Sequence, residues 1–497
     1  MKSKFKLLKA ILFLLIFHRQ TTYSQTTITV GSKPAQTFQG TGFNTLNYGD
    51  WDLWINSSES DKRYFMSKFI TESKFTIVRP WPENDLKSKY FSNKLIPYMV
   101  DAGVKFVVIT GGLNENDGVS NPCTNAFGRA AYYFSRIKSL VDAGYKVTHF
   151  DIRNKTNTRQ FANCRMEPSD VINAITTART LFDSNGLKDI GIIGPSTVEF
   201  FPKNHIDAAH VAAYDCKLGD DSLYYTAINN SPAAMAALKG FSMQDYGLGI
   251  STYMQNITLA SGKESWVSLA ATDDAGNNNA NWMLPAISAA QYLSDVNHGA
   301  THFTHWSSGQ FIQDGTPSNP IFQGRFYVFK ALNEIFDVGS VFRISTSTPY
   351  LYSSDMQWKY LKEPDIISAT TKNLDGSFGI GIVNLTGLNA EHRFLNYYSA
   401  NEKTIVVTLN IPELANVPLL SLTVSRIRSG EQFITTSEPI VMINGKATIS
   451  VTSMEIVALR SQIPSGLNNN IADNFKIYPI PSNVYLQLNL KVILLSA

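Results

Sequence analysis

Residues 147–152 read VTHFDI, a short run with apolar residues at 147, 150 and 152 that is followed by the polar residues Arg153, Asn154 and Lys155. A run of this length, bounded by polar or turn-forming residues, is typical of a strand buried in a parallel sheet. Similar runs recur on both sides of it, separated by longer segments with helical patterns. The predicted strands are residues 38–44, 76–80, 105–110, 147–152, 190–195, 240–243, 265–269 and 301–306.

Two of the intervening segments carry clear helix signals. Residues 130–143 are followed by Gly144, and residues 168–185 begin with a proline and are followed by Gly186. Proline in the first turn and glycine after the last turn are typical of helix ends. The alternation of strands and helices therefore predicts an α/β fold, a (β/α)8 barrel over residues 39–339.

After residue 340 the pattern changes to alternating polar and apolar residues without a convincing helix, which predicts an antiparallel β-sandwich over residues 340–462. Residues 25–38, upstream of the barrel, include the strand-like run TITV and are expected to join this sandwich. The predicted strands of the sandwich are residues 365–370, 378–385, 404–411, 421–429, 440–443 and 446–459.

Length and charge limit the function classes. The chain has 497 residues, of which 44% are apolar and 12% aromatic, enough for a large core and two domains. Its 43 basic and 40 acidic residues give a formal net charge of +3, and no dense basic run occurs after residue 9. We therefore expect no nucleic-acid partner.

The first 24 residues predict export. Four early lysines precede an apolar stretch over residues 10–17, and Thr22 and Ser24 are small residues where a signal peptidase could cut. The apolar stretch is shorter than the roughly 20 residues of a membrane-spanning helix. We expect a secreted protein, extracellular or at the cell surface, without a membrane span.

Three cysteines, Cys123, Cys164 and Cys216, leave one unpaired after any pairing. Cys123 and Cys164 follow the predicted third and fourth barrel strands, so a disulfide between them would join two loops on the same face of the barrel. Three separate buried thiols are the alternative. No Cys-x-x-Cys pair occurs, and we expect neither a metal site nor a cofactor.

Two stretches carry a family resemblance: residues 150–157 read FDIRNKTN and residues 265–270 read SWVSLA. They resemble the ends of the fourth and seventh barrel strands of clan-A glycoside hydrolases. The order of elements over residues 28–460 is most similar to glycoside hydrolase family thirty. The family has its proton-donating Glu where this chain has Lys155, and its nucleophilic Glu where this chain has Leu269. The resemblance implies a β-linked polysaccharide or oligosaccharide as ligand, and a retaining mechanism that needs both carboxyl groups.

The resemblance also implies substrate-binding residues. Arg79 matches an arginine that hydrogen-bonds near the nucleophile, and Asn154 matches the asparagine that binds a sugar hydroxyl. Tyr246 matches a tyrosine beside the nucleophile, with Gln244 in place of a family histidine, and Trp306 matches an aromatic platform for a pyranose ring. Three of these residues have a structural alternative: an ion pair for Arg79, loop stabilisation for Asn154 and core packing for Trp306.

Lys155 and Leu269 change the expected mechanism. A lysine amine, with an ordinary pKa of about 10.4, is a poor proton donor to an acetal oxygen, and a leucine cannot be a nucleophile. We therefore predict a protein that binds a glycan in the barrel cleft and is impaired in catalysis. Lys155 could pair with sulfate or uronate groups of an anionic ligand. A structural relic without function is a further alternative, as is an active glycoside hydrolase whose carboxylates have moved to Glu199, Asp273 or Asp274.

The end of the chain carries a second resemblance. Residues 475–482 read FKIYPIPS and resemble the opening of the C-terminal sorting domain of type IX secretion. Residues 463–473 are expected to be a linker, and residues 474–497 a truncated sorting-domain-like tail. This resemblance implies a partner in the secretion machinery.

Overall fold

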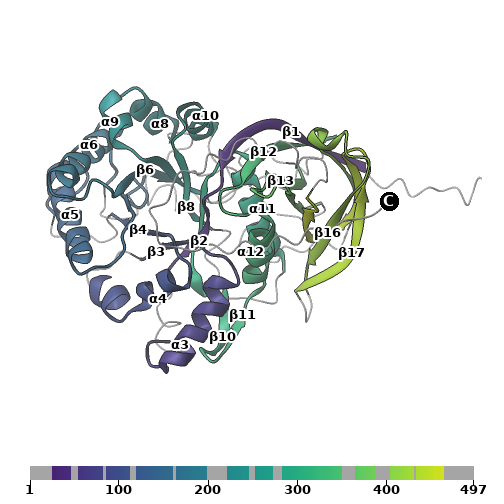
Figure 1. The fold of residues 1–497 in the computed structure, drawn as a ribbon. Helices are drawn as coiled ribbons and strands as arrows, with labels where there is room; N and C mark the ends of the chain where they lie inside the picture. The colour runs from purple at the N-terminus through teal and green to yellow at the C-terminus, as the bar shows by residue number, and fades with distance from the viewer. Residues whose placement is uncertain are drawn as a thin grey trace, which may run out of the picture.

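The computed structural model describes residues 25–45, 54–81, 86–111, 119–159, 164–198, 221–245, 252–271, 282–349, 364–386, 403–429 and 433–463. The predicted signal peptide, residues 1–24, and the predicted tail, residues 474–497, lie outside these stretches. Figure 1 shows a barrel surrounded by helices and, beside it, a strongly curved sheet. The predicted fold class, a (β/α)8 barrel followed by a β-sandwich, is confirmed.

Eight parallel strands form a closed barrel in chain order, and the first strand pairs with the last through Gly40 and His302. All eight strands lie where the sequence predicts them, within a few residues at each end. They are β2 (Gly40–Asn44), β3 (Ile77–Arg79), β4 (Phe106–Thr110), β5 (His149–Asp151), β6 (Gly191–Val198), β7 (Gly240–Asp245), β8 (Glu264–Ala270) and β9 (His302–His305).

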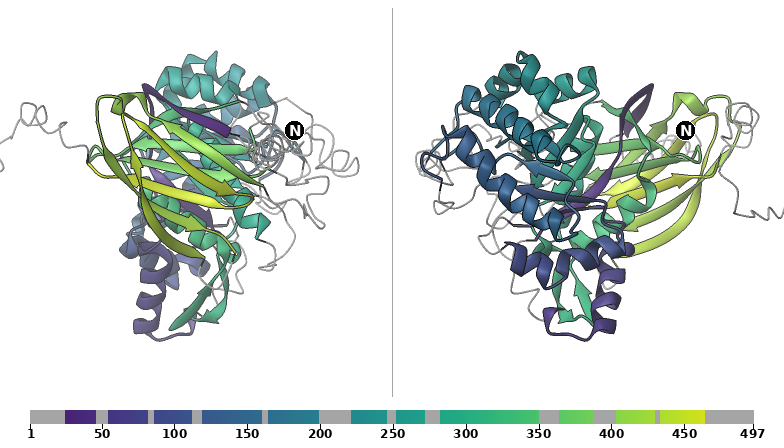
Figure 2. Two further views of the ribbon diagram at one scale, coloured as in Figure 1. Left: turned by 90° about the vertical axis from the view of Figure 1, so that its right-hand side faces the viewer. Right: turned by 60° about the vertical axis from the view of Figure 1, so that its left-hand side comes forward.

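Helices cover the outside of the barrel, as Figure 1 and the right-hand view of Figure 2 show. Their apolar sides pack against the outward side chains of the strands, for example Phe150 of β5 against Phe182 of α6, with ring centroids 5.7 Å apart. The α-helices are α3 (Glu59–Met66), α4 (Leu95–Ala102), α5 (Ala126–Asp142), α6 (Pro168–Ser184), α8 (Asp221–Asn229), α9 (Pro232–Ala237), α10 (Thr252–Ser261), α11 (Met283–Asn297) and α12 (Gly324–Ile335).

Shorter elements complete the barrel domain. After β9 the chain forms a 3-10 turn, η3 (Ser308–Gln310), and a hairpin of β10 (Ile312–Thr316) and β11 (Asn319–Phe322), which the sequence pattern did not predict. Two π-helical segments, η1 (Ser67–Thr71) and η2 (Lys87–Ser92), flank the strand β3 in sequence. Among the described residues, no helix is both long and apolar enough to cross a membrane.

The sandwich is built from one continuous nine-stranded sheet that encloses its own core of buried residues, among them Ile28, Ile380, Val407 and Leu422. All neighbouring strands are antiparallel except β1 and β15. In spatial order the strands are β17 (Ile434–Met442), β16 (Leu420–Ile427), β19 (Ile456–Ser461), β14 (Phe378–Asn384), β13 (Ile366–Lys372), β12 (Val341–Thr348), β1 (Gln25–Thr37), β15 (Thr404–Asn410) and β18 (Lys446–Thr452).

Two details of this sheet differ from the sequence-based expectation. Residues 446–459 were expected to form one strand, but they form β18 and the start of β19, separated by a turn in which Met454 has a positive φ of 61°. A turn here lets β19 pair with β14 and β16 instead of continuing beside β15. Strand β12, which directly follows the barrel, was not predicted, because its run of serines and threonines lacks an apolar pattern.

Candidate functional site

The C-terminal end of the barrel contains an inward layer of polar side chains. Asn44, Arg79 and Asp151 are the last residues of β2, β3 and β5. Successive side chains of a strand point to opposite faces, and Ile77, two places before Arg79, belongs to the apolar cluster inside the barrel. Arg79 therefore also points inward. We call this layer the polar floor; its members are Asn44, Arg79, Asp151, Ser196, Ser242 and Ser268.

Arg79 is the centre of the polar floor. Its guanidinium is 1% exposed and donates from Nη1 to Asn44 Oδ1 at 2.6 Å. From Nη2 it donates to Asp151 Oδ2 at 3.2 Å and to Asn154 Oδ1 at 3.3 Å. Asn44 is held in turn, because its Nδ2 donates to the carbonyl of His305 at 3.0 Å. A buried guanidinium needs such partners, since an unpaired charge inside a protein is costly.

Asp151 balances the charge of Arg79. Its other oxygen, Oδ1, accepts a hydrogen bond from Ser196 Oγ at 2.6 Å, and Ser196 Oγ lies 2.8 Å from Ser242 Oγ. Burial raises the pKa of the Asp151 carboxyl above its ordinary value, and the Arg79 guanidinium and the serine hydroxyls offset part of that rise. Ser196 has a positive φ of 55°, an uncommon conformation for a residue other than glycine.

Asn154 and Gln244 lie at the same end of the barrel. The backbone N–H of Asn154 donates to the carbonyl of Gly111 at 2.9 Å, which ties the loop after β5 to the end of β4. Its side-chain Oδ1 accepts from both Arg79 Nη2 and Gln244 Nε2. Asn154 and Gln244 are both fully buried. Gln244, which the resemblance matches to a family histidine, is thus a direct neighbour of Asn154, the predicted sugar-binding asparagine.

Lys155 and Leu269 both lie close to this pair in the fold. Lys155 directly follows Asn154, is 7% exposed and has a positive φ of 63°. Leu269 is fully buried, and its Cα partner in the β7–β8 ladder is Gln244. The two positions that the resemblance matches to the family's carboxylates therefore lie at the same end of the barrel, where they hold an amine and an aliphatic side chain.

Trp306 follows β9 and is partly exposed. Its backbone N–H donates to the carbonyl of Ala270, at the end of β8, at 2.7 Å. Its indole meets the partly exposed indole of Trp81 edge to face, with ring centroids 5.6 Å apart. Trp81 follows β3 and is anchored by its backbone N–H, which donates to Thr45 Oγ1 at 3.0 Å. The pair places two indole rings at the C-terminal end of the barrel.

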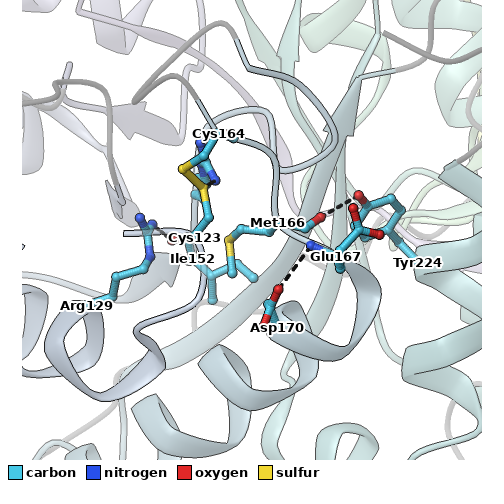
Figure 3. The surroundings of a disulfide bond; sticks show 9 residues. Cys123, Arg129, Ile152, Cys164, Met166, Glu167, Asp170 and Tyr224 are labelled. Carbon is cyan, nitrogen blue, oxygen red and sulfur yellow. Dashed lines mark hydrogen bonds between the residues drawn. A yellow bond between two sulfur atoms is a disulfide. The ribbon is translucent and has the colours of Figure 1, made fainter. Parts of the chain in front are cut away.

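A disulfide joins two loops on this face. Cys123 and Cys164 are bridged, with Cα atoms 6.1 Å apart, which decides between the two alternatives left by the sequence. Arg153 Nη1 lies 2.8 Å from Cys123 Sγ, and Arg153 Nη2 donates to the carbonyl of Cys164 at 2.6 Å. Figure 3 shows the bridge beside Met166, whose carbonyl accepts a hydrogen bond from Tyr224. The bridge thus ties Cys164, nine residues after Lys155, to Cys123.

Four predicted site residues, Tyr246, Glu199, Asp273 and Asp274, lie outside the described residues, as does Cys216. Among the residues that the structure does describe, no group of three His, Cys, Asp or Glu side chains is arranged to hold a metal ion.

Sequence reasoning missed Asn44, Asp151 and Ser196 as parts of the site. The signal that could have found Asn44 and Asp151 is the period-two alternation of inward residues, because both are polar residues at inward positions of strand ends. Ser196 offered no such signal, since it follows Pro195 at an irregularity in the β6–β7 pairing.

Comparison with known proteins gives a fold but no family. No protein-family model and no curated protein sequence matches the chain. Among solved structures, the catalytic domain of glycoside hydrolase family 30 xylanase C from Talaromyces cellulolyticus has a TM-score of 0.60 at 16% identity, covering 88% of this chain and 100% of that one.

Two further solved structures give the same picture. A family 30 endoxylanase from Clostridium papyrosolvens has a TM-score of 0.58 at 12% identity, covering 88% of this chain and 100% of that one. An endo-β-1,6-glucanase has a TM-score of 0.54 at 14% identity, covering 87% and 94%. At these identities the likeness shows the fold alone, a glycoside-hydrolase-like barrel with a sandwich.

Proposed function

We propose that this protein binds a β-linked polysaccharide or oligosaccharide at the C-terminal end of its barrel and does not cleave it by the two-carboxylate mechanism. The observation that carries the proposal is the partly exposed pair Trp81 and Trp306 at that end of the barrel. Indole rings combine a large apolar face with a polar N–H, which suits them to the apolar face of a pyranose ring and its hydroxyl edge.

The carboxylates at the ends of the described barrel strands favour binding over cleavage. At the ends of the described barrel strands the carboxylates are Asp151 and Asp245. The oxygens of Asp151 are already engaged by Arg79 and Ser196, so Asp151 is poorly placed to attack a sugar or to protonate a leaving group. Since Lys155 and Leu269 occupy the family's two catalytic positions, the retaining mechanism lacks both of its groups.

Two other functions are alternatives to glycan binding without cleavage. An active glycoside hydrolase would use Glu199, Asp273 or Asp274 as relocated carboxylates, and an inverting arrangement would need two of them about 6.5 to 9.5 Å apart. A structural relic would bind no glycan at all. Reducing-end release distinguishes the first alternative from binding, and a binding titration distinguishes the second.

We place this binding outside the cell, at the cell surface or in the medium. The support is the signal-peptide pattern of residues 1–24 and the likeness of residues 475–482 to a type IX sorting signal. Cell fractionation of the native host, with antibody detection of the full chain, tests this part: we expect the protein in the surface or medium fraction, and a purely cytosolic signal would contradict it.

The test of the proposed function is a titration of the purified protein with xylan and β-1,6-glucan oligosaccharides. We expect measurable binding without reducing-end release. Trp306→Ala should weaken binding by about tenfold, as loss of an aromatic binding contact commonly costs more than 1 kcal/mol. The matched control is Tyr64→Ala, an exposed aromatic residue on α3, which should leave affinity unchanged. Release of reducing ends by the unmodified protein would overturn the non-catalytic part, and absence of binding to all glycans tested would overturn the whole proposal.

A further inference from the structure

A cavity of about 310 Å³ lies at the N-terminal end of the barrel, opposite to the polar floor. Its wall is formed by segments that directly precede the strands β2, β3 and β4 and by the C-terminal end of helix α12. Its volume is within the range of small-molecule binding sites. None of the residues proposed to bind a glycan lines it, so this cavity is separate from the glycan site.

The interior of the cavity is apolar and its rim is exposed. Side chains that are at most 1% exposed line the interior: Phe38, Ile70, Phe75 and Phe336. Exposed residues, among them Thr71 and Gly103, line the rim. An apolar group of a ligand can therefore enter from the surface and pack against aromatic and aliphatic side chains.

Buried polar side chains in the wall already have partners in the protein. Thr76 Oγ1 donates to the carbonyl of Gln39 at 3.1 Å. Asn333 Nδ2 donates to Thr41 Oγ1 at 2.7 Å, and Asn333 Oδ1 accepts from the Tyr292 hydroxyl at 2.9 Å. A ligand therefore finds its polar partners at the charged residues of the wall, which are Lys74, Lys105 and Asp337.

Two of these residues are cations and one is an anion, so the wall carries a net positive charge. Lys105 is exposed, and its ammonium group has no ion pair with any of the described residues. Lys74 Nζ lies 3.8 Å from Asp337 Oδ1, too far for a hydrogen bond. Asp337 is held instead by Arg460, whose Nη2 donates to Oδ2 at 2.6 Å. Both ammonium groups can therefore bind an anion at the rim.

The backbone of Lys74 is a further sign of a function for its side chain. Lys74 has a positive φ of 56° and follows the end of η1. Its N–H donates to the carbonyl of Thr71, and the N–H of Phe75 donates to the carbonyl of Ile70, both at 3.2 Å. Glycine is the usual residue at this position of a helix end, because a Cβ atom makes the left-handed conformation unfavourable. A lysine here has a conformational cost that helix capping does not explain, since these carbonyls have backbone donors.

We propose that this cavity is a second binding site, for a small amphipathic anion. The apolar body of the ligand, aliphatic or aromatic, occupies the interior, and its carboxylate pairs with Lys74 and Lys105 at the rim. An uncharged ligand would leave both ammonium groups unused, and a cationic one would be repelled by them. The inference does not depend on the proposed glycan binding, because the two sites share no residue.

A titration of the unmodified protein with octanoate, 4-phenylbutyrate, octylamine and acetate tests the ligand class, with binding measured by ligand-observed nuclear magnetic resonance. We expect at least one of the two amphipathic carboxylates to bind at least fivefold more tightly than octylamine, which has the opposite charge, and than acetate, which lacks the apolar body. Tighter binding of octanoate would identify an aliphatic body, and tighter binding of 4-phenylbutyrate an aromatic one. Octylamine binding as tight as that of both carboxylates, or failure of both carboxylates to bind, would overturn the inference and leave glycan binding intact.

Two variants locate the site. Lys74→Gly removes one ammonium group and places glycine where the backbone favours it, so this variant should be at least as stable as the unmodified protein in thermal unfolding. Lys105→Met removes the other ammonium group and keeps most of the side-chain stem. Each should weaken binding of the preferred carboxylate about fivefold.

The matched control is Lys94→Gly. Lys94 is also exposed and also has a positive φ, 71°, but it does not line the cavity. This substitution therefore makes the same change of charge and backbone freedom as Lys74→Gly, and should leave the affinity for the carboxylate unchanged. Equal affinities in Lys74→Gly, Lys105→Met and Lys94→Gly would overturn the inference, because the carboxylate would then bind elsewhere.

Discussion

The Asp151 carboxylate balances the positive charge of the Arg79 guanidinium, which is buried away from water. Asp151→Asn keeps the shape of the side chain and the contact with Ser196 but removes the charge opposite Arg79. Because a buried charge would be left uncompensated, we expect the free energy of unfolding to fall by about 3 to 5 kcal/mol. Urea denaturation followed by circular dichroism measures the loss.

An exposed ion pair gives the control for this substitution. Asp142 pairs with Lys138 one turn earlier on α5, and its side chain is 58% exposed. Such pairs contribute roughly 0 to 1 kcal/mol, so Asp142→Asn should leave the unfolding free energy almost unchanged. Equal effects of the two substitutions would show that Asp151 carries no special charge-balancing role.

At the scale of single residues, the sequence singled out Arg79, Asn154 and Trp306 as candidates but not Asp151. Arg79 was proposed through the family resemblance, which assigned it a role near a nucleophile. In the structure its charged partner is Asp151, 72 residues away in the chain. No local sequence pattern predicts the Arg79–Asp151 pair, because the two residues meet only when the barrel closes. A polar residue at a strand end is also ambiguous, since turn-forming polar residues are common at the same positions.

Strand ends also build a second layer, at the opposite end of the barrel interior. His302 of β9 stacks on Trp266 of β8 with ring centroids 3.6 Å apart and planes 8° apart. Glu264 accepts from Trp266 Nε1 at 2.9 Å and lies 3.1 Å from His149 Nε2. Four inward side chains from three strands thus close the N-terminal end of the barrel.

This layer makes stability depend on pH. Burial lowers the pKa of His302 to about 3, and the contacts of Glu264 with His149 and Trp266 outweigh the effect of burial and lower the pKa of Glu264 to about 2. Both groups bind a proton more readily in the unfolded chain than in the folded protein. Stability is therefore greatest above pH 6.5, falls with His302 from that pH downward, and falls further with Glu264 below pH 4.5.

His302→Phe keeps an aromatic ring on Trp266 and removes the titrating group. We expect the unmodified protein to lose on the order of 3 kcal/mol between pH 6.5 and pH 4 through His302, and the variant to lose correspondingly less. Thermal unfolding at pH 7, 5.5 and 4 measures the difference between the two slopes. Parallel pH curves for the two proteins would exclude His302 as a source of the acid sensitivity.

At the scale of elements, apolar runs and the turn-forming residues that bound them predicted all eight barrel strands, because strands buried in a parallel sheet are rich in apolar residues. They failed where tertiary pairing decides the structure. Strand β12 has the sequence VFRISTST and forms because β1 and β13 pair with it on both sides. The hairpin of β10 and β11 was missed for another reason: residues 314–320 read DGTPSNP, so turn-forming residues occupy the turn at residues 317 and 318 and also the paired strand positions beside it.

The barrel and the sandwich meet across a mixed interface. Helices α11 and α12 lie between them (Figure 1), and Arg460 of β19 pairs with Asp337, just after α12, at 2.6 Å. Phe433, just before β17, stacks on Trp282 and on Tyr327, with ring centroids 5.8 and 4.7 Å apart. Trp282 also donates from Nε1 to the carbonyl of Met454 at 2.8 Å. Aromatic, ionic and backbone contacts therefore all couple the two domains.

This coupling predicts that the barrel and the sandwich unfold together. Phe433→Ala removes a ring that two barrel side chains contact, and should lower stability by about 2 kcal/mol, less than for a fully buried phenylalanine because Phe433 is only partly buried. In differential scanning calorimetry we expect one transition, shifted to lower temperature as a whole. Phe127→Ala, at a side chain that is 68% exposed, is the matched control and should leave the transition in place. Two separate transitions in the unmodified protein would mean that the domains unfold independently. A shift confined to one of two transitions in Phe433→Ala would likewise mean that the stacked rings do not couple the unfolding of the two domains.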